Sequence, residues 1–384
     1  MTRGPLAPHY GGGALDSVLP TIAAALGSRT YADRLTGSST AGEAPSRRAV
    51  VVLVDGLGDD LLRRRSGHAP FLRGLLGSGR RIDAGYPTTT ATSMGTFGTG
   101  LAPGAHGMVG YEVLDPMTDR ILNELSWDNG PDPLAWQPSA TVFETLAAEG
   151  VSVTRVGPGY FDGSGLTNAA LRGGRFVAAD TLAARVEATL AALRTGSRSL
   201  VYLYWGELDR TGHVHGCDSW QWGEELESVD RELAALAQRL PTDTALHIVA
   251  DHGMVDVPFA DRVDLADTPE LDAGLRHLGG EPRSPQLYCQ EGAVADVLTA
   301  WTERFAEQAW VLEREEAVAA GWFGEVRPEN LPRIGDIIVA FHGSRATVDR
   351  RRMRPVLLEL LGLHGSLTSQ ELAVPWLVLP ARTG

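Results

Sequence analysis

The chain has 384 residues, 43% of them hydrophobic, so it is long enough to bury a large core and too hydrophobic to be disordered. Its formal net charge of −14, with no basic stripe to offset it, argues against a nucleic-acid polymer or an anionic membrane surface as a partner. All 34 basic residues are arginines, which excludes a lysine nucleophile, a Schiff base and a Walker-type lysine.

The N-terminus does not have the pattern of a targeting segment. Its apolar residues are interrupted by Asp16, Pro20 and several glycines, and no basic start precedes about 7 to 15 apolar residues. No stretch approaches the ~20 apolar residues of a membrane span. Two cysteines, Cys217 and Cys289, provide no disulfide framework. We therefore expect a cytoplasmic protein that does not bind membranes, and no feature of the sequence indicates an oligomeric state.

Several short apolar runs, mostly of β-branched residues, predict buried parallel strands that alternate with helices. The runs are residues 49–54, 151–156, 200–205 and 245–250. Strands that alternate with helices predict an α/β fold with a doubly wound, mostly parallel sheet and helices on both faces. Ligands of such sheets bind beyond the carboxyl ends of the strands, which is where the polar residues discussed below fall.

Two stretches interrupt this alternation within an expected single catalytic domain, residues 1–384. Residues 112–138 are rich in Pro, Asp, Asn and Trp, which predicts an inserted loop or hairpin. Residues 258–333 show few repeats of the pattern and predict a cap insertion. Within and after this stretch we expect a strand at 286–289, a helix at 293–305, and strands at 334–341 and 374–379.

A hydroxyl-rich segment, Pro87-Thr88-Thr89-Thr90, precedes an expected helix. Hydroxyls at a helix N-terminus lie beside unpaired N–H groups and the positive end of the helix dipole, which suits a phosphate. The same composition is typical of an ordinary helix cap. The segment alone therefore does not distinguish a phosphate site from a cap.

Acidic residues and histidines follow two of the expected strands. Asp209 and His213 are four residues apart, about one helical turn, so both side chains can reach one point, although such a pair can also be a simple surface contact. Asp251 and His252 precede Gly253, which allows a sharp bend that lets adjacent side chains converge.

Together with Asp55 and His364, these residues form a candidate set of metal ligands. Alone, Asp55 can cap a helix and His364 can be a bystander in a loop. Three carboxylates and three imidazoles are enough for two tetrahedral sites when a nucleophile or water supplies the remaining ligand. Mixed ligation by His and Asp favours zinc over magnesium or calcium, and manganese or iron is also compatible. The set is Asp55, Asp209, His213, Asp251, His252 and His364.

The order of these motifs resembles that of the alkaline phosphatase superfamily, most closely its nucleotide pyrophosphatase/phosphodiesterase branch. In chain order they are Asp-Gly, Pro-Thr-x-Thr, Asp-x-x-x-His, Asp-His-Gly and His-Gly, and residues 87–107 keep the branch's spacing. The resemblance implies an alkaline-phosphatase-like fold with two zinc ions and Thr90 as the nucleophile. It also implies two sets of ligands, Asp55, Thr90, Asp251 and His252 for one ion, and Asp209, His213 and His364 for the other.

The chain departs from this pattern at Tyr111, where the branch places an Asn that hydrogen-bonds the phosphoryl oxygen. Tyr111 is therefore a candidate catalytic donor through its hydroxyl, and the alternative is a residue at the pocket rim that selects the leaving group. No arginine falls between Arg81 and Arg120, so no arginine nearby in the sequence clamps a phosphate dianion. This absence favours diesters over monoesters.

These features predict a two-zinc hydrolase that cleaves phosphodiester or pyrophosphate bonds in nucleotide-like or other small phosphate esters through a phospho-threonine intermediate. Alternatives within the superfamily are a phosphonoacetate-type hydrolase, a phosphomonoesterase and a cofactor-independent phosphoglycerate mutase. A sulfatase does not fit, because Cys217 and Cys289 lack the Cys-x-Pro-x-Arg context. An alternative of another class is a non-catalytic metal-binding module on the same fold.

Overall fold

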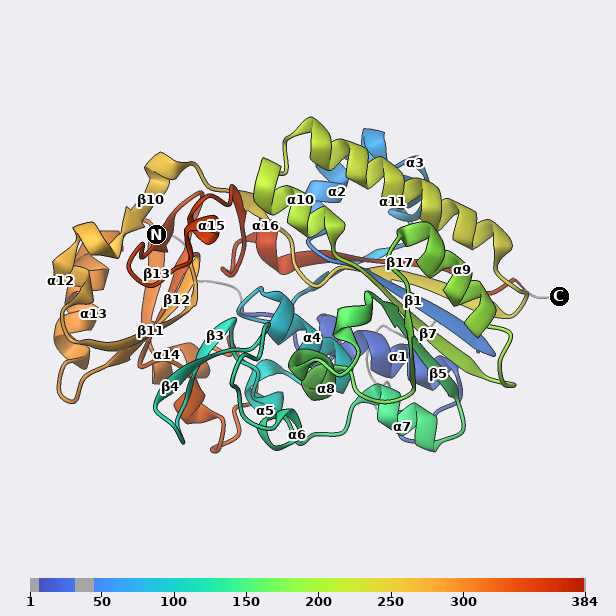
Figure 1. The fold of residues 1–384 in the computed structure, drawn as a ribbon, viewed down its shortest axis with the longest axis horizontal. Coiled ribbons are helices and arrows are strands. Elements are labelled where there is room, and N and C mark those ends of the chain that lie inside the picture. The colour runs from blue at the N-terminus through green and yellow to red at the C-terminus, as the bar shows by residue number, and fades with distance from the viewer. Residues whose placement is uncertain (1–6, 32–44, 383–384) are drawn as a thin grey trace.

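A seven-stranded sheet forms the centre of the computed structural model, which describes residues 7–31 and 45–382 (Figure 1). Its order is β2 (Arg80–Asp83), β17 (Ala373–Leu379), β8 (Thr244–Val249), β1 (Arg48–Val54), β7 (Ser199–Trp205), β5 (Ser152–Gly157) and β6 (Arg175–Ala178). The five strands from β8 to β6 run parallel, whereas β17 runs antiparallel to β8 and β2 antiparallel to β17. The expected mostly parallel α/β fold is confirmed.

The register of the central strands brings their carboxyl ends to one edge of the sheet. Strand β1 lies between β7 and β8, with Val54 opposite Trp205 and Leu53 opposite Val249. Its residues from 49 to 54 are all buried, as expected for a strand covered on both faces. Asp55 comes directly after β1 and Asp251 two residues after β8, so the sheet itself brings the two carboxyl groups together.

Helices cover both faces of this sheet (Figure 1). One face carries α2 (Asp59–Arg64), α3 (Pro70–Leu75), α9 (Leu182–Ala192), α10 (Glu207–His215) and α11 (Trp220–Arg239). The other carries α1 (Val18–Ala25), α4 (Thr90–Thr99), α5 (Pro103–His106), α6 (Pro133–Trp136), α7 (Val142–Ala148) and α8 (Gly165–Ala170). In α11, the side chain of Ser219 accepts a hydrogen bond from the Trp222 N–H and caps the helix, and buried Leu226, Val229 and Leu233 form its apolar stripe.

A second, four-stranded antiparallel sheet lies to one side of the main sheet (Figure 1). Its order is β11 (Leu275–Glu281), β12 (Ser284–Cys289), β14 (Ile337–Phe341) and β13 (Ala309–Glu313). Helix α13 (Val294–Phe305) packs on it through Val297, Trp301 and Phe305, which recur every four residues and are buried. We call this unit the small sheet.

Several shorter elements lie outside the two larger sheets. They are the hairpin β3 (Glu112–Asp115) and β4 (Arg120–Asn123), the pair β10 (Arg262–Asp264) and β15 (Ala346–Val348), the pair β9 (Val255–Asp256) and β16 (Gly362–Leu363), and helices α12 (Pro269–Asp272), α14 (Arg314–Ala319), α15 (Pro355–Leu358) and α16 (Ser369–Leu372). The insertion boundaries at 112–138 and 258–333 stay predictions, and the small sheet also includes β14, which follows residue 333. None of the helices in the described ranges is long and apolar enough to span a bilayer.

A fully buried ion pair joins the small sheet to the segment that carries His364. Arg283, in the turn between β11 and β12, donates from Nε and Nη2 to the two carboxylate oxygens of Glu371 at 2.7 and 2.8 Å. Both side chains are completely buried. Glu371 also accepts from the Ser366 N–H at 3.0 Å and the Thr368 hydroxyl at 2.5 Å. The pair therefore fixes the loop just after His364.

We expect Glu371→Leu to lower the free energy of unfolding by about 3–5 kcal/mol, because the Arg283 charge then stays buried without its partner. Chemical denaturation of the two proteins measures the change. The matched control is Glu187→Leu, which removes the acidic partner of Arg239 in an exposed ion pair and should have a much smaller effect. Equal effects of the two substitutions would contradict a special role for the buried pair.

Candidate active site

The three consecutive threonines before and at the start of α4 have different surroundings. Thr90 is the first residue of the helix, and its hydroxyl oxygen lies 3.3 Å from His252 Nε2. Thr89 is the N-cap residue but makes no side-chain capping hydrogen bond. Thr88 donates to the Ser366 carbonyl at 2.8 Å and accepts from the Gly365 N–H at 3.0 Å. Thr90 is therefore the threonine that faces the acidic residues and histidines.

Asp55, Asp251 and His252 form the first group of candidate ligands, which we call the first triad. Their ligand atoms all lie within 4.8 Å of one another, and all three residues are buried. His252 Nε2 is 3.4 Å from Asp55 Oδ1 and 3.4 Å from Asp251 Oδ2. Asp55 follows β1 and the other two follow β8, so the parallel pairing of these strands creates the group.

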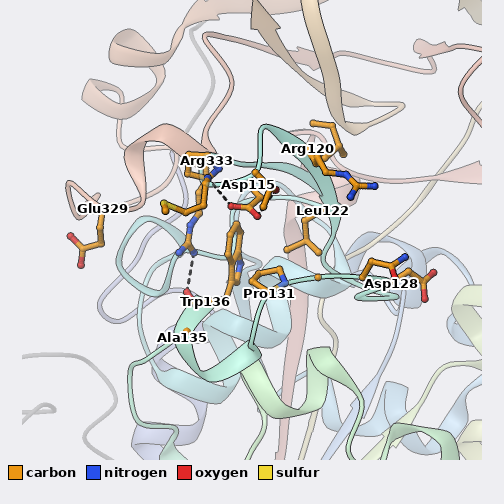
Figure 2. A pocket seen from close by; sticks show the side chains of 15 residues that line it. Asp115, Arg120, Leu122, Asp128, Pro131, Ala135, Trp136, Glu329 and Arg333 are labelled. Carbon is orange, nitrogen blue, oxygen red and sulfur yellow. Dashed lines mark hydrogen bonds between the residues drawn. The ribbon is translucent and has the colours of Figure 1, made fainter.

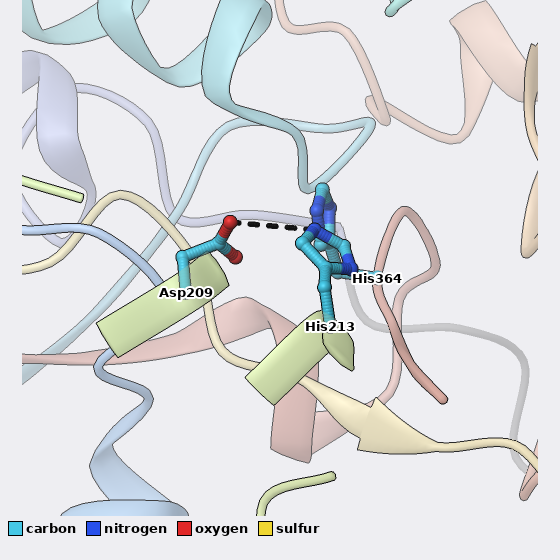
Figure 3. Close-up of side chains that lie close together, drawn as sticks. All are labelled: Asp209, His213 and His364. Carbon is cyan, nitrogen blue, oxygen red and sulfur yellow. Dashed lines mark ion pairs between the residues drawn. The ribbon is translucent and has the colours of Figure 1, made fainter. Parts of the chain in front are cut away.

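Asp209, His213 and His364 form the second triad, shown in Figure 3. Asp209 and His213 lie one turn apart on α10, and His213 Nε2 is 3.3 Å from Asp209 Oδ2. His364 follows β16 and reaches them from a different part of the chain. The rings of His252 and His364 stack with centroids 3.8 Å apart, so the two triads are adjacent. The structure thus brings together all six residues expected as ligands.

Each of the three histidines directs Nε2 towards the site because Nδ1 is held by a backbone carbonyl. The Nδ1 atoms of His213, His252 and His364 lie 2.7, 3.0 and 2.8 Å from the carbonyl oxygens of Gly362, Gly253 and Thr88. In a neutral imidazole, this arrangement places the proton on Nδ1 and the free electron pair on Nε2. Histidines that bind metals have the same orientation, since the ring nitrogen that does not bind the metal donates a hydrogen bond to a neighbouring acceptor.

Each carboxylate of the two triads keeps one oxygen without a hydrogen bond. Asp55 Oδ1, Asp209 Oδ1 and Asp251 Oδ2 are buried and accept none from any residue within the described ranges. The remaining oxygens of the first triad are satisfied, because Tyr204 donates to Asp55 Oδ2 at 2.5 Å and the Gly56 N–H to Asp251 Oδ1 at 3.1 Å. Unpaired buried carboxylate oxygens are costly. Together with the free Nε2 atoms, they fit two cations that accept nitrogen and oxygen ligands.

The pKa values show how unfavourable this cluster is without cations. Burial, followed by the charges of Asp251 and Asp209, raises the pKa of Asp55 well above its ordinary value. Burial, followed by the charge of the neighbouring His252, lowers the pKa of His364 well below its own. Protons and metal ions therefore compete for the same buried atoms, so that metal binding would release protons.

The chain bends at Asp251, and Gly253 also permits a close contact that the sequence did not predict. It is not among the glycines with a positive φ angle. Instead, a Cβ atom at this position would lie 2.0 Å from the carbonyl oxygen of Gln370. Its N–H donates to the Glu371 carbonyl at 2.8 Å. Because Gly253 has no side chain, the segment that follows β8 can lie close to α16, the helix that contains Glu371.

A cavity of about 430 Å³ opens beside Thr90 and is also lined by Asp55 and Asp209. We call it the large cavity. Aromatic rings form part of its wall, with Phe161 between Tyr160 and Tyr204 at centroid distances of 4.8 and 5.3 Å. The described residues that line it include no arginine. Its volume and its mostly uncharged wall suit an organic group attached to a phosphate at Thr90.

Tyr111 lines a different, smaller cavity, together with Glu281 from the end of β11. Burial raises the pKa of Tyr111 and also raises that of Glu281, to about 8. The donor role of Tyr111 stays a prediction. Sequence reasoning missed Glu281 and Tyr204, since neither belongs to a motif, and the only signal for Tyr204 is a polar tip in the apolar run of β7.

Another cavity, of about 530 Å³, lies between the β3–β4 hairpin and α6 (Figure 2). Two of its charged side chains, those of Arg333 and Asp115, already have partners in the protein. The Arg333 guanidinium stacks 3.6 Å from the Trp136 ring and donates to the Gly107 carbonyl at 2.8 Å. Asp115 accepts from the Thr118 hydroxyl at 2.7 Å. None of the residues expected to carry chemistry lines this cavity.

Comparison with known proteins agrees with this geometry. The family model for type I phosphodiesterase / nucleotide pyrophosphatase matches residues 49–367. Among solved structures, murine ectonucleotide pyrophosphatase/phosphodiesterase 5 is 20% identical with a TM-score of 0.70, over 86% of this chain and 87% of that one. Phosphonoacetate hydrolase from Sinorhizobium meliloti is 21% identical with a TM-score of 0.66, over 89% and 93%. At these identities the two structures show a shared fold.

We expect Tyr204→Phe to weaken zinc binding by ~10- to 100-fold, because the lost hydroxyl no longer orients the Asp55 carboxylate. Competition with a chromophoric chelator measures the affinity. Tyr202→Phe is the matched control, since Tyr202 lines the same cavity but its hydroxyl contacts the Met94 sulfur instead. Unchanged zinc affinity in the Tyr204 variant would show that the hydrogen bond does not support the site.

Proposed function

The chain belongs to the type I phosphodiesterase / nucleotide pyrophosphatase family, and from this we propose that it is a two-metal hydrolase of phosphodiester or pyrophosphate bonds with Thr90 as its nucleophile. The observation that supports this most strongly is the pair of adjacent triads beside the Thr90 hydroxyl, each with at least one carboxylate oxygen that lacks a hydrogen bond within the described residues. A purely structural cluster would satisfy these oxygens with donors from the protein.

Asp55, Asp251 and His252 would hold one ion, and the second triad would hold the other. Two zinc ions, or manganese or iron in their place, would lower the pKa of the threonine hydroxyl and of water and would offset the negative charge of the phosphate. Two divalent cations also exceed the charge of the three carboxylates by one, so the site accepts an anionic substrate. The proposal thus includes a requirement for metal ions in the activity of this protein.

Thr90 then acts by nucleophilic displacement. Its oxygen forms a bond to phosphorus while the bond to the leaving oxygen breaks on the opposite side, and the leaving oxygen takes up a proton. Water next breaks the phospho-threonine bond and restores the hydroxyl. The N–H groups of Ala91 and Thr92 precede the first hydrogen bond of α4, which Ser93 donates to Thr89, and they can hold the phosphoryl oxygens.

We propose a small, nucleotide-like phosphate ester as the substrate, with its organic group in the large cavity. The murine relative was also solved as an inactive variant in complex with AMP. In this chain, Tyr160 and Phe161 offer aromatic surface in the large cavity that suits a nucleobase. A phosphonoacetate-type hydrolase is less favoured, because the lining of that cavity has no arginine to bind a substrate carboxylate.

Removal of metal should abolish turnover of a chromogenic phosphodiester and lower the melting temperature, since the buried carboxylates then repel one another without counter-charge. At a free zinc concentration of 100 times Kd, each site would add about 2.7 kcal/mol to the free energy of unfolding. Dialysis against a chelator followed by addition of zinc tests both effects by calorimetry and rate. Full activity in protein shown by elemental analysis to lack transition metals would refute the two-metal proposal.

Thr90→Ala should reduce the rate by several orders of magnitude, an increase of about 5 kcal/mol or more in the barrier, while zinc content stays near that of the unmodified protein. Steady-state rates and elemental analysis provide the two measurements. Thr89→Ala and Thr88→Ala are the matched controls and should be far milder. If the Thr89 variant were inactive and the Thr90 variant active, the nucleophile would have been assigned one residue away from its true position.

A further inference from the structure

The first turn of α4 carries a second hydroxyl that contacts the first triad, that of Ser93. Ser93 follows Thr90 by three residues, about one helical turn, so the two side chains lie on the same side of the helix. Ser93 is fully buried, and its hydroxyl donates a hydrogen bond to the main-chain carbonyl of Asp251 at 2.8 Å. The helix that carries Thr90 is therefore tied directly to the backbone of a candidate metal ligand.

The segment that follows β8 is held by hydrogen bonds on three sides. The Gly56 N–H, just after β1, donates to the side chain of Asp251 at 3.1 Å. The Gly253 N–H donates to the Glu371 carbonyl at 2.8 Å. The Ser93 hydroxyl supplies the third hydrogen bond, from the side of α4. Of the three, it is the one that a substitution can delete without changing a main-chain group or a candidate ligand.

The Ser93 hydrogen bond is also the one between α4 and this segment that a bound cation would leave intact. Within the described ranges, two hydrogen bonds join α4 to residues 251–253, and the second is the 3.3 Å contact between the Thr90 hydroxyl and His252 Nε2. A cation at His252 would take up the Nε2 electron pair that this hydroxyl contacts. The Ser93 hydroxyl would then be the hydrogen bond that fixes the start of α4 against the segment.

The position of α4 matters because it determines where the Thr90 oxygen lies. Attacking and attacked atoms must come within about 3–3.5 Å of each other with the correct alignment, and a displacement of ~1 Å can reduce the rate by ~100-fold. Thr90 is the first residue of the helix, where the N–H groups have no partner within the helix. A hydrogen bond one turn further on is therefore well placed to fix the orientation of this helix end.

We propose that Ser93 is a positioning residue, which keeps the Thr90 oxygen in line with the substrate phosphorus by fixing α4 to the backbone of Asp251. This inference rests on the function proposed above. It adds a residue outside both triads that controls the rate of attack by Thr90 and leaves the binding of metal and substrate to other residues.

Ser93→Ala tests this inference, because it removes the hydroxyl and leaves both triads unchanged. Release of the leaving group from a chromogenic phosphodiester in a single turnover, with zinc-loaded enzyme in excess, reports the attack by Thr90. The maximal rate should fall by ~10- to 100-fold. The enzyme concentration at half-maximal rate and the zinc content should stay near those of the unmodified protein. Ser93→Cys keeps a weaker donor of similar size and should give an intermediate rate.

Thr99→Ala is the matched control from the other end of α4. Thr99 is also buried, and its hydroxyl donates to the Gly95 carbonyl at 2.6 Å, within the same helix. This variant should lose thermal stability, as Ser93→Ala does, but keep the single-turnover rate. A loss of rate as large as that of Ser93→Ala would mean that any buried hydroxyl of α4 has the same effect, and it would overturn the inference. An unchanged rate in Ser93→Ala would also overturn it.

Calorimetric titration of the zinc-loaded protein with vanadate and with phosphate supplies a readout without turnover. Vanadate can adopt the five-coordinate geometry of the transition state with the Thr90 oxygen as one ligand, so the preference for vanadate over phosphate reports how well this oxygen is placed. The ratio of the two Kd values should change by ~10- to 100-fold in Ser93→Ala.

The same titration in the Thr90→Ala background shows whether Ser93 acts through Thr90. There, Ser93→Ala should leave the ratio of Kd values unchanged, and an equal change in both backgrounds would overturn the inference. Failure of the proposed function itself has a different signature. In that case Thr90→Ala alone would keep both the turnover and the preference for vanadate, whichever residue stands at position 93.

Discussion

Three buried carboxylates gathered at the end of a parallel sheet are the constraint on which the rest of the site depends. Parallel pairing of β1 with β7 and β8 brings Asp55, Asp209 and Asp251 to the same edge, where burial makes their mutual repulsion severe. The surrounding residues all reduce the free-energy cost of burying these three carboxylates together, and they do so in the same way. Tyr204, the Gly56 N–H and the three imidazoles satisfy part of each carboxylate and leave the remaining oxygens to a cation.

The second triad depends on a distant part of the chain, and the buried Arg283–Glu371 pair supplies the connection. The Glu371 carboxylate accepts a hydrogen bond from the backbone N–H of Ser366, two residues after His364. Its partner Arg283 belongs to the small sheet. The small sheet therefore does more than cover the main sheet. It positions the loop with His364 and brings Glu281 against it, so that the fold of one unit determines the chemistry at the edge of the other.

The sequence predicted those parts of the structure that depend on short-range patterns. Apolar runs identified β1, β5, β7 and β8 to within a residue or two, and the spacing of Asp209 and His213 predicted their common helix. Residues whose importance comes from long-range contacts were not predictable. Glu281 belongs to no motif and lies against the site because Gly365 permits close packing, and Gly253 permits a close contact with the Gln370 carbonyl in addition to the bend. Such contacts depend on tertiary structure that no local pattern records.

The acceptors that orient the three histidines have a consequence for how this site tolerates change. All three are main-chain carbonyls, of Thr88, Gly253 and Gly362, so no single replacement of a side chain can delete them. Where a carboxylate orients a ligand, one substitution removes the support; here only a movement of the backbone can do so. Replacement of neighbouring side chains therefore leaves the acceptors that fix the imidazole tautomers in place.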